Sequence, residues 1–498
     1  MNIFYKLLLL IFIFPLAAKA DCDFRTGDYI LELSKTDKIK EIEITIPNSR
    51  KYFKELKNYL LDGFRTTKKK KHKAIFNVKY EFGKCIYTGK VWQNGDADDH
   101  IKEYIRSLNV KLDNGNVFNA TKFKLLIPES RNGRNEILGT LILRELGLIS
   151  PETFEIAVNV NGINSIMLFQ EDSRKELLER NKRREGPIFE GDESLFWGYG
   201  KYNPGELENI SLSRMINQNW FLKNRSAEII SLNAFFKLQN AYLKYSNGSA
   251  TAGNIIFPNN KENDEFIDYY FLMTVMNGIH ALRPHNRKYY FNSFDQYFEP
   301  IYYDGDFYLI GDKNFEKTLS PHVIWKVFYY GYKYKDLSKL SDSKFENKII
   351  NNFKERISNF QNDDEIWINS RLKSISNSAN NLQNLINKTP KNKFISHDFN
   401  YDLYRRKYLK ALKNHGFIQN NINKISYKKK KYFVNNDLEF DKLEMSKIIS
   451  RNKVNKKRLV FIPNAYLFKN NINFRRINLP STKLDLNVYY SDGIKIKV

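Results

Sequence analysis

Apolar and polar residues alternate through most of residues 73–127, in the stretches KAIFNVKYEF, CIYTGKVW, LNVKL and KFKLLIP. This period of two predicts β-strands that bury one face. Turn signals separate the stretches at 94–95 (Asn-Gly) and at 113–115 (Asp-Asn-Gly). A further strand-like stretch, EIEITIP, lies at 41–47. The N-terminal part of the chain is therefore expected to be rich in β-structure.

The spacing of apolar residues becomes helical after residue 130. In RNGRNEILGTLILRELGLISP, one apolar face contains Leu138, Leu141, Ile142 and Leu146. Gly147 and Pro151 are typical of the residues that end a helix, so a helix is expected to stop near 147. The next segment, FEIAVNVNGINSIMLFQED, predicts a hairpin around the Asn-Gly pair at 161–162.

The second half of the chain alternates between helical and strand-like patterns. Residues 206–245 are expected to be helical, and DEFIDYYFLMTVMN at 264–277 predicts a buried, very apolar helix. Two aromatic strands follow in RKYYFNSFDQYFEPIYY. Residues 340–390 are again helical, and from about 395 the pattern becomes short, Lys- and Asn-rich strands without a clear core.

The first twenty residues, MNIFYKLLLLIFIFPLAAKA, have the pattern of a secretory signal peptide. Lys6 supplies the positive charge, residues 7–14 form a short apolar run, and residues 18–20 (Ala-Lys-Ala) fit a cleavage site. The mature chain is expected to start near Asp21 and to have no transmembrane span. An uncleaved anchor is the alternative. We expect a secreted protein that resides in a bacterial periplasm or cell envelope.

Cysteine content and charge add two expectations about the environment. Cys22 and Cys85 are the two cysteines of the chain. In an oxidising compartment they would form an intramolecular disulfide, and otherwise they are two unpaired thiols. The formal net charge is +25, spread along the chain apart from basic runs at 68–73 and 427–432. Without a zinc spacing or an aromatic RNA-binding signature, we expect no specific nucleic acid, and an anionic envelope polymer is the better partner.

One ordered set of polar residues fits phosphoryl transfer. That reaction needs a positive group on the phosphates, a divalent ion held by oxygen ligands and a group that orients the nucleophile. Lys124 lies on a predicted strand, and Glu136 opens the next helix. Asn286 follows the apolar helix, and Asp304 and Asp306 flank a glycine after two further strands. Two carboxylates at i and i+2 can face one ion, although each of these turns alone is also an ordinary polar turn.

In this order of motifs the chain resembles the CotH family of atypical secreted kinases, named for a spore-coat protein. The similar segments run from about residue 80 to 310. They are GDADDHI, SLNVKLDNGN, FKLLIPESRNGRNEILGTLILRELGLISPETFEIAVNVNG, EGPIFEGDE, HNRKYYFN and YYDGD. The long central segment is specific, whereas the last two are short. The resemblance implies ATP and a divalent metal, Mg²⁺ or Mn²⁺, as cofactors, and transfer of the γ-phosphate to a protein or envelope acceptor.

The resemblance also implies roles for individual residues. The metal-binding aspartate of the family corresponds to Asp304, with Asp306 as its companion, and the asparagine before an aromatic strand corresponds to Asn286. The acidic residue after the Asn-Gly hairpin corresponds to Glu171. Lys124 and Glu136 are assigned to cofactor binding by their order in the chain.

The fold implied by the resemblance is α+β: a diverged, kinase-like, two-lobed fold with a β-rich N-terminal part, a helical lobe and a β-rich C-terminal extension. The expected organisation has five parts. They are a signal peptide at 1–20, an N-terminal α/β segment at 21–75, the kinase-like core at 76–345, a helical segment at 346–395 and a basic β-rich region at 396–498.

The chain departs from the family at the expected catalytic loop. No acidic residue lies between Asp268 and Asp295, where the family usually has an aspartate. His280 and His285 are the titratable residues left as a general base, and histidine suits that role because it titrates near neutral pH. The alternative is a catalytically degenerate relative that acts as an envelope binding or assembly protein. A carbohydrate-active enzyme fits poorly, because carboxylates two residues apart in one turn do not flank a bond from opposite sides.

Overall fold

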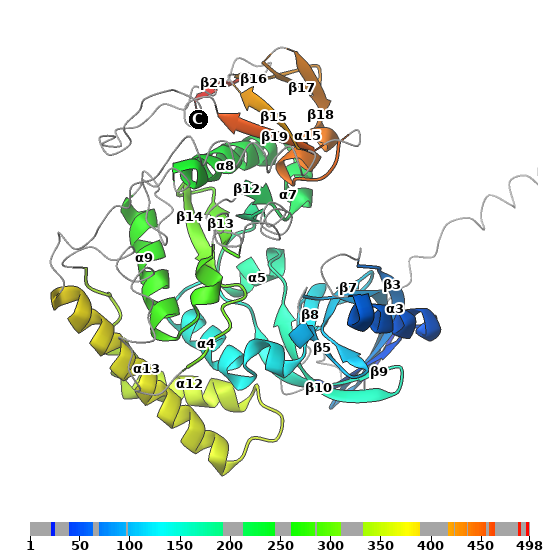
Figure 1. Ribbon diagram of the computed structural model, residues 1–498, viewed down its shortest axis with the longest axis vertical. Helices are drawn as coiled ribbons and strands as arrows, with labels where there is room; N and C mark the ends of the chain where they lie inside the picture. Colours follow the sequence, from blue (N-terminus) through cyan, green and yellow to red (C-terminus); the bar gives the residue numbers. More distant parts are fainter. Residues whose placement is uncertain are drawn as a thin grey trace, which may run out of the picture. The chain divides into compact units, whose positions relative to one another are not determined.

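The protein is described by a computed structural model (Figure 1). The described residues are 21–24, 39–62, 69–95, 98–192, 213–244, 260–283, 286–309, 332–388, 417–422, 424–435, 437–454, 458–463, 487–489 and 495–497. The chain divides into two compact units. The barrel unit contains residues 1–137, 151–172 and 352–360, and the second unit contains residues 138–150, 173–351 and 361–498. The predicted signal peptide at 1–20 lies outside the described residues.

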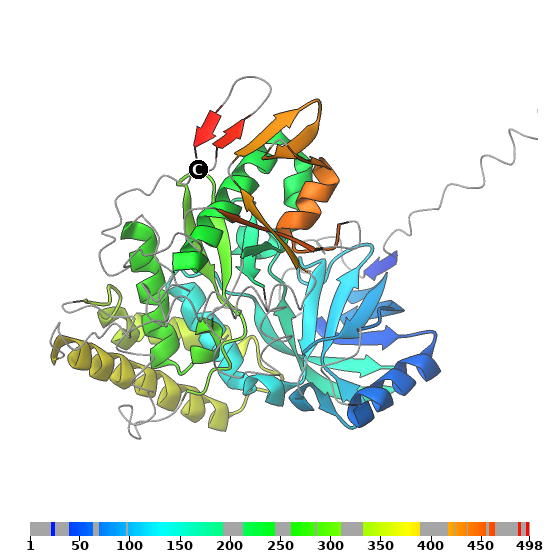
Figure 2. The ribbon, with the colours of Figure 1, turned by 45° about the horizontal axis from the view of Figure 1, so that its top comes forward.

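Seven strands of the barrel unit form a closed ring, drawn in blue to cyan in Figure 2. Their order is β4-β3-β2-β9-β10-β8-β7, and the ring closes because β7 also pairs with β4. All neighbours are antiparallel except β2 and β9, which are parallel. An eighth strand, β1 (Asp21–Phe24), pairs with the other end of β4. The ring strands are β2 (Ile39–Thr45), β3 (His72–Tyr80), β4 (Gly83–Gln93), β7 (Leu108–Leu112), β8 (Lys122–Leu126), β9 (Thr153–Val160) and β10 (Ile163–Glu171).

Alternate side chains of these strands fill the interior of the ring, and every second residue faces outward. On β3 and β4 this alternation buries Phe76, Val78, Tyr87 and Val91. Helix α3 (Ser49–Asp62) contributes Tyr52 to the same core. The guanidinium of Arg106 lies 3.9 Å from the centre of the Tyr52 ring, and burial raises the pKa of the Tyr52 hydroxyl. The helix is therefore part of the barrel core.

The closed ring corrects the expected fold class. The two-lobed, kinase-like fold implied by the resemblance is wrong, because the β-rich N-terminal part is a closed seven-stranded barrel. The physical reason is the length and pairing of β4, whose eleven residues pair with β3 along one edge and with β1 and β7 along the other. Alternation of apolar residues predicts the strands but not which strand edges meet.

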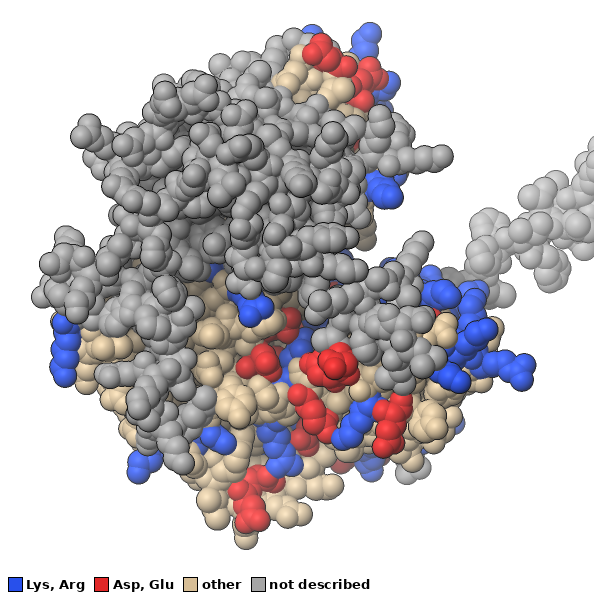
Figure 3. Space-filling model, in the orientation of Figure 1, with Lys and Arg blue, Asp and Glu red and all other residues tan. Residues whose placement is uncertain are grey.

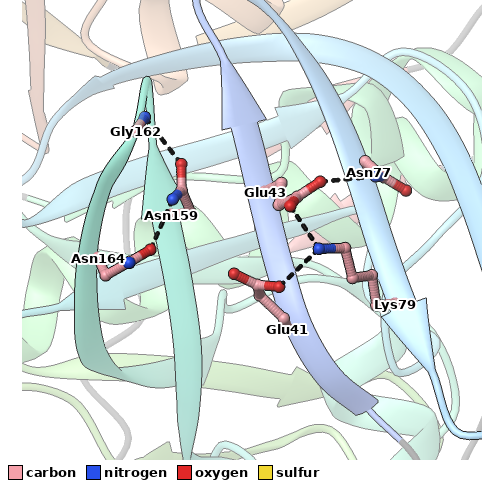
Figure 4. Close-up of polar contacts among 7 residues, drawn as sticks. All are labelled: Glu41, Glu43, Asn77, Lys79, Asn159, Gly162 and Asn164. Atoms are coloured by element: carbon pink, nitrogen blue, oxygen red, sulfur yellow. Dashed lines mark hydrogen bonds and ion pairs between the residues drawn. The ribbon is translucent and has the colours of Figure 1, made fainter.

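Several local predictions are confirmed in the barrel unit. Asn161 and Gly162 connect β9 to β10 with φ angles of 49° and 91°, as a two-residue hairpin turn requires. The side chain of Asn159 supports this turn, because its Oδ1 accepts a hydrogen bond from the Gly162 amide at 2.8 Å (Figure 4). Cys22 and Cys85 face each other across β1 and β4 and form the expected disulfide.

The second unit contains most of the helices and a four-stranded antiparallel sheet. Helix α4 (Arg134–Glu145) enters it from the barrel unit and ends where expected, with Gly147 at a φ of 83°. The sheet order is β12-β11-β13-β14. The helices predicted further along are found as α7 and α8, α9, α12 and α13, but within the range 206–245 that was expected to be helical, residues 213–215 form strand β12 instead. Their bounds, with those of the sheet, are α5 (Lys175–Arg180), β11 (Ile188–Gly191), β12 (Ser213–Met215), α7 (Gln218–Lys223), α8 (Arg225–Lys244), α9 (Asn260–Val275), β13 (Lys288–Asn292), β14 (Tyr297–Ile301), α12 (Ser343–Lys354) and α13 (Asn362–Lys388).

The C-terminal region, which shows no clear core in the sequence, is attached to the helices of the second unit. The Tyr432 hydroxyl donates a hydrogen bond to Glu228 of α8, and the ammonium of Lys442 lies 2.5 Å from the same carboxylate. Both Tyr432 and Met445 are fully buried. The elements are β15 (Phe417–Ile422), β16 (Lys424–Lys428), β17 (Lys431–Val434), β18 (Leu438–Asp441), α15 (Lys442–Ile449), β19 (Arg458–Pro463), β20 (Asn487–Tyr489) and β21 (Lys495–Lys497).

Among the helices that the structure describes, none combines the length and the apolar character needed to cross a lipid bilayer.

Candidate metal and phosphate site

The acidic turn after β14 has a backbone that its aromatic neighbours hold in place. Tyr302 and Phe307 stack with ring centres 4.7 Å apart, and the amide of Gly305 donates a hydrogen bond to the Tyr302 hydroxyl at 3.1 Å. A side chain at Gly305 would collide with this ring, since its Cβ would lie 2.6 Å from a ring carbon. The sequence YYDGDF therefore folds into a tight turn around the Tyr302 ring.

Phe307 anchors the end of this turn in the core of the second unit. It is fully buried, and its ring occupies space that a Cβ at Gly139 or Gly278 would fill. With both ends fixed, Asp304 and Asp306 adopt φ angles of 54° and 55°. Such left-handed backbone is uncommon for residues other than glycine, and it persists where the surroundings impose it, often at functional sites.

Three residues predicted from the sequence come together beside this turn. The Nε2 atom of His280 lies 3.7 Å from Oδ2 of Asp304. The Nδ2 atom of Asn286 donates a hydrogen bond to the backbone oxygen of His280 at 3.2 Å. Asn286 is buried, whereas the His280 and Asp304 side chains are 38% and 18% exposed. Asn286 and Asp304 thus both lie against His280, Asn286 at its backbone oxygen and Asp304 beside its partly exposed side chain.

Asp306 and His285 have different outcomes. Asp306 is exposed on the same turn. It lies two residues after Asp304. His285, the second candidate for a general base, lies outside the described residues.

Lys288 belongs to this cluster, although the sequence did not single it out. Its side chain is 6% exposed, and its Nζ lies 3.6 Å from the centre of the Tyr303 ring and 3.4 Å from Oγ of Ser173. In the sheet it stands opposite Glu190 and Ile301. The sequence feature that could have identified Lys288 is its position as the first residue of the strand KYYFN, which is otherwise mainly aromatic. The cluster therefore contains a buried cation next to the acidic turn.

Lys124 and Glu136, predicted to bind the cofactor, lie in the barrel unit. Lys124 on β8 stands directly opposite Gln170 of β10, and Nε2 of Gln170 donates a hydrogen bond to Oε1 of Glu136 at 2.8 Å. Lys124 is 5% exposed and Glu136 is fully buried. Directly opposite residues point to the same face of a sheet. Gln170 is therefore a neighbour of both predicted residues.

Glu171, predicted as a catalytic residue, points to the other face of β10 because successive side chains alternate. Its Oε2 accepts a hydrogen bond from the backbone amide of Glu152 at 3.3 Å. The carboxylate of Glu152 lies 2.6 Å from Nε of Arg356. The structure thus places Glu171 in a hydrogen-bonded network at the start of β9, on the face opposite to Lys124.

A scan of protein-family models and a search of curated proteins each found no match to this chain. The likeness to the CotH family therefore rests on the sequence segments themselves.

Proposed function

We propose that the protein is an extracytoplasmic phosphotransferase that transfers the γ-phosphate of ATP to a protein or envelope acceptor with a divalent metal. The observation that carries the proposal is the convergence of His280, Asn286 and Asp304 next to the buried Lys288. The proposal concerns the chemistry of this cluster. The kinase-like two-lobed architecture is excluded by the closed barrel and forms no part of it.

The oxygen ligands of the cluster suit Mg²⁺ or Mn²⁺. No group of three or more His, Cys, Asp or Glu side chains with metal-binding geometry occurs within the described ranges. Mg²⁺ does not need such a group, since it is commonly held by one or two carboxylates, several waters and the phosphates of its substrate. Asp304 and Asn286, with Asp306 nearby in the turn, fit this mode. A metal bound there would neutralise charge that develops on the transferred phosphate.

The remaining residues of the cluster match the other needs of phosphoryl transfer. Lys288 supplies a positive charge close to the acidic turn, where phosphate oxygens would lie. The Nε2 atom of His280 lies 3.7 Å from Oδ2 of Asp304, a separation that exceeds a normal hydrogen bond. Catalytic hydrogen bonds commonly tighten when ligand binds. We assign His280 the role of orienting or deprotonating the acceptor hydroxyl.

For nucleotide binding, Lys124 and Glu136 remain predicted residues, and Glu171 remains a predicted catalytic residue. The hydrogen bond from Gln170 to Glu136 supports a fixed orientation for the Glu136 carboxylate. Secretion to a periplasm or cell envelope is also part of the proposal. It is supported by the signal-like N-terminus and by the Cys22–Cys85 disulfide, because disulfides persist in oxidising compartments.

The test is metal-dependent nucleotide binding and transfer by the purified mature chain. Calorimetry with ATP and Mn²⁺ should show binding that Asp304→Asn weakens by at least about 10–100-fold, the range known for changes around metal ligands. Asp363→Asn, which removes an exposed carboxylate from the first turn of α13, is the matched control and should bind as the wild type does. Absence of metal-dependent binding by the wild type, or an equal loss in both variants, would refute the proposal.

A catalytically degenerate envelope protein is the second candidate, and the missing acidic residue between Asp268 and Asp295 favours it. Mass spectrometry of the chain after incubation with labelled ATP separates the two. Self-modification that is lost in His280→Gln, with nucleotide binding retained, supports the enzyme. Nucleotide binding without any transfer supports the degenerate relative.

A further inference from the structure

Four lysines stand directly opposite one another across four neighbouring strands of the barrel. The register pairs Lys73 of β3 with Lys90 of β4, Lys90 with Lys111 of β7, and Lys111 with Lys122 of β8. We call these four residues the lysine row. The residue after each of them is buried, namely Ala74, Val91, Leu112 and Phe123. Since side chains alternate along a strand, the lysine row projects from the outer face of the barrel.

The lysine row is electrostatically unfavourable by itself. Like charges directly opposite each other destabilise a sheet, and strands about 4.8 Å apart place the four side chains within about 14 Å. Lys122 is neutralised by Asp172, with Nζ 2.6 Å from Oδ2. Across the described part of the chain, no ion pair involves Lys73, Lys90 or Lys111. The nearest other acid by register is Asp113, which follows β7 by one residue.

The opposite arrangement occurs on the outer face of the same barrel, on β2 and β3. There Lys79 forms ion pairs with Glu41, at 2.8 Å, and with Glu43 (Figure 4). Asn77 donates a hydrogen bond to Glu43 at 2.7 Å. We call Glu41, Glu43, Asn77 and Lys79 the neutral patch because the charge of its lysine is neutralised, although the four side chains together carry one net negative charge. An outward-facing lysine of this barrel can thus be neutralised by a glutamate on the neighbouring strand. At three positions of the lysine row, the residue opposite is another lysine instead.

We propose that the lysine row binds a linear acidic polysaccharide, with its carboxylates along the row. One carboxylate on each sugar gives a repeating negative charge that complements a lysine on each strand. Trp92, two residues after Lys90 on the same face, adds an apolar surface for the face of a sugar ring. Lys71 extends the basic surface, with Nζ 4.9 Å from the centre of the Trp92 ring. Figure 3 shows Lys and Arg side chains at the edge of the barrel unit near α3, the helix whose lysines serve as the charge-matched control in the test below.

An acidic polysaccharide fits this surface better than a polynucleotide does. The lysine row contains no arginine, the residue whose planar fork matches phosphate groups. The disulfide between Cys22 and Cys85 holds β4, the strand that carries Lys90, and favours an oxidising compartment. No residue of the lysine row belongs to the cluster around Asp304. The inference therefore goes beyond the proposed phosphotransfer, and either one can fail alone.

The test uses the full mature chain and polygalacturonate as the probe. The triple variant Lys73→Gln, Lys90→Gln, Lys111→Gln should bind about tenfold more weakly or worse at low salt. The slope of the logarithm of its binding constant against the logarithm of salt concentration should be smaller in magnitude by about two to three, because fewer counterions are released. The matched control is Lys51→Gln, Lys54→Gln, Lys57→Gln, which removes the same charge from exposed positions of α3. This control should keep the wild-type affinity and salt slope.

Two outcomes would overturn the inference. An equal loss in the α3 control would show that net charge alone attracts the polymer. Tighter binding of a single-stranded oligonucleotide than of polygalacturonate at about 0.15 M salt would assign the surface to nucleic acid. If the triple variant does not fold, the exposed single variant Lys111→Gln serves instead, and its salt slope should fall by about one.

Discussion

The lysine row and the neutral patch are made of similar residues on the outer face of one barrel, and they differ in how register pairs them. In the neutral patch, Lys79 lies between two glutamates and its charge is cancelled within the protein. In the lysine row, lysine faces lysine, and three of the four charges have no ion pair within the described ranges. Strand β3 contributes to both, with Lys73 in the row and Lys79 in the patch. The difference separates a surface that stabilises the barrel from one that is available to a partner.

The largest expected effect comes from removing the disulfide of β4, the strand that also carries Lys90. Cys22→Ser with Cys85→Ser opens a covalent loop of 63 residues, and we expect a loss of about 4 kcal/mol in the free energy of unfolding, from the entropy of the released chain. Urea denaturation measures it. The lysine row itself is retained, so polygalacturonate binding by the folded variant should persist. A loss of stability below about 1 kcal/mol would contradict this account of the bond.

A lysine-to-glutamate substitution should change the free energy of unfolding in opposite directions in the two regions. Lys79→Glu brings three carboxylates together and should lower the free energy of unfolding by about 1 kcal/mol, a modest value because the side chain is 41% exposed. Lys90→Glu places a negative charge between two lysines and should raise it by about 0.2–1 kcal/mol. Thermal and urea unfolding of both variants test this, with Lys57→Glu on α3 as a control near zero. Equal signs at positions 79 and 90 would erase the distinction between the regions.

The smallest effect is a pH dependence confined to the neutral patch. The hydrogen bond from Lys79 lowers the pKa of Glu43 below its usual 4.5. Because the pKa of Glu43 is lower in the folded state than in the unfolded state, the stability that its pairing with Lys79 contributes is fully present above pH 4.5. This stability disappears as the pH falls through the pKa of the folded state. The stability difference between wild type and Lys79→Gln should therefore shrink by a few tenths of a kcal/mol between about pH 6 and pH 3.

The lysine row provides the control for this pH dependence. The stability difference between wild type and Lys111→Gln should stay constant over the same pH range, because within the described ranges no carboxylate forms an ion pair with Lys111. Urea unfolding at several pH values measures both differences. A matching change in the Lys111→Gln series would locate the acid sensitivity elsewhere in the barrel.

Local elements could be predicted from the sequence because their signals lie within a few residues. Asn161 and Gly162 supply the two positive φ angles of a tight hairpin, and Gly147 the one that ends α4. From the sequence alone, a Cys22–Cys85 disulfide and two unpaired thiols were both open, because the expected compartment did not decide between them. Formation of the disulfide follows from a register in which Cys22 and Cys85 are direct cross-strand neighbours.

Closure of the barrel could not be predicted in the same way. It depends on the pairing of β4 with β7 and on the parallel pairing of β2 with β9, which joins residues more than 100 positions apart. Neither pairing changes the alternation within a strand, so the same pattern suits many arrangements of the sheet. The family resemblance suggested a different arrangement, and the pairings overruled it.

The candidate site was partly predictable for a related reason. His280, Asn286 and Asp304 lie within 25 residues and surround one short hairpin, so their proximity follows from local structure. Lys288 was missed because a lysine in a strand normally points to solvent, and only the packing of Tyr303 and Ser173 shows that it is buried. The lysine row could not be recognised in the sequence because its members lie 11 to 21 residues apart and only the strand register brings them together.

Strand β4 makes disulfide formation a check on correct folding. It pairs with β1, β3 and β7, and a shift of one residue would turn every side chain to the other face. Such a slip would move Cys85 away from Cys22 and send Lys90 into the apolar interior. Oxidation therefore proceeds readily only in the native register. A chain whose thiols stay free would report a misassembled barrel, and once its register is corrected, exchange with an external disulfide, which is reduced to two thiols, would form the Cys22–Cys85 bond.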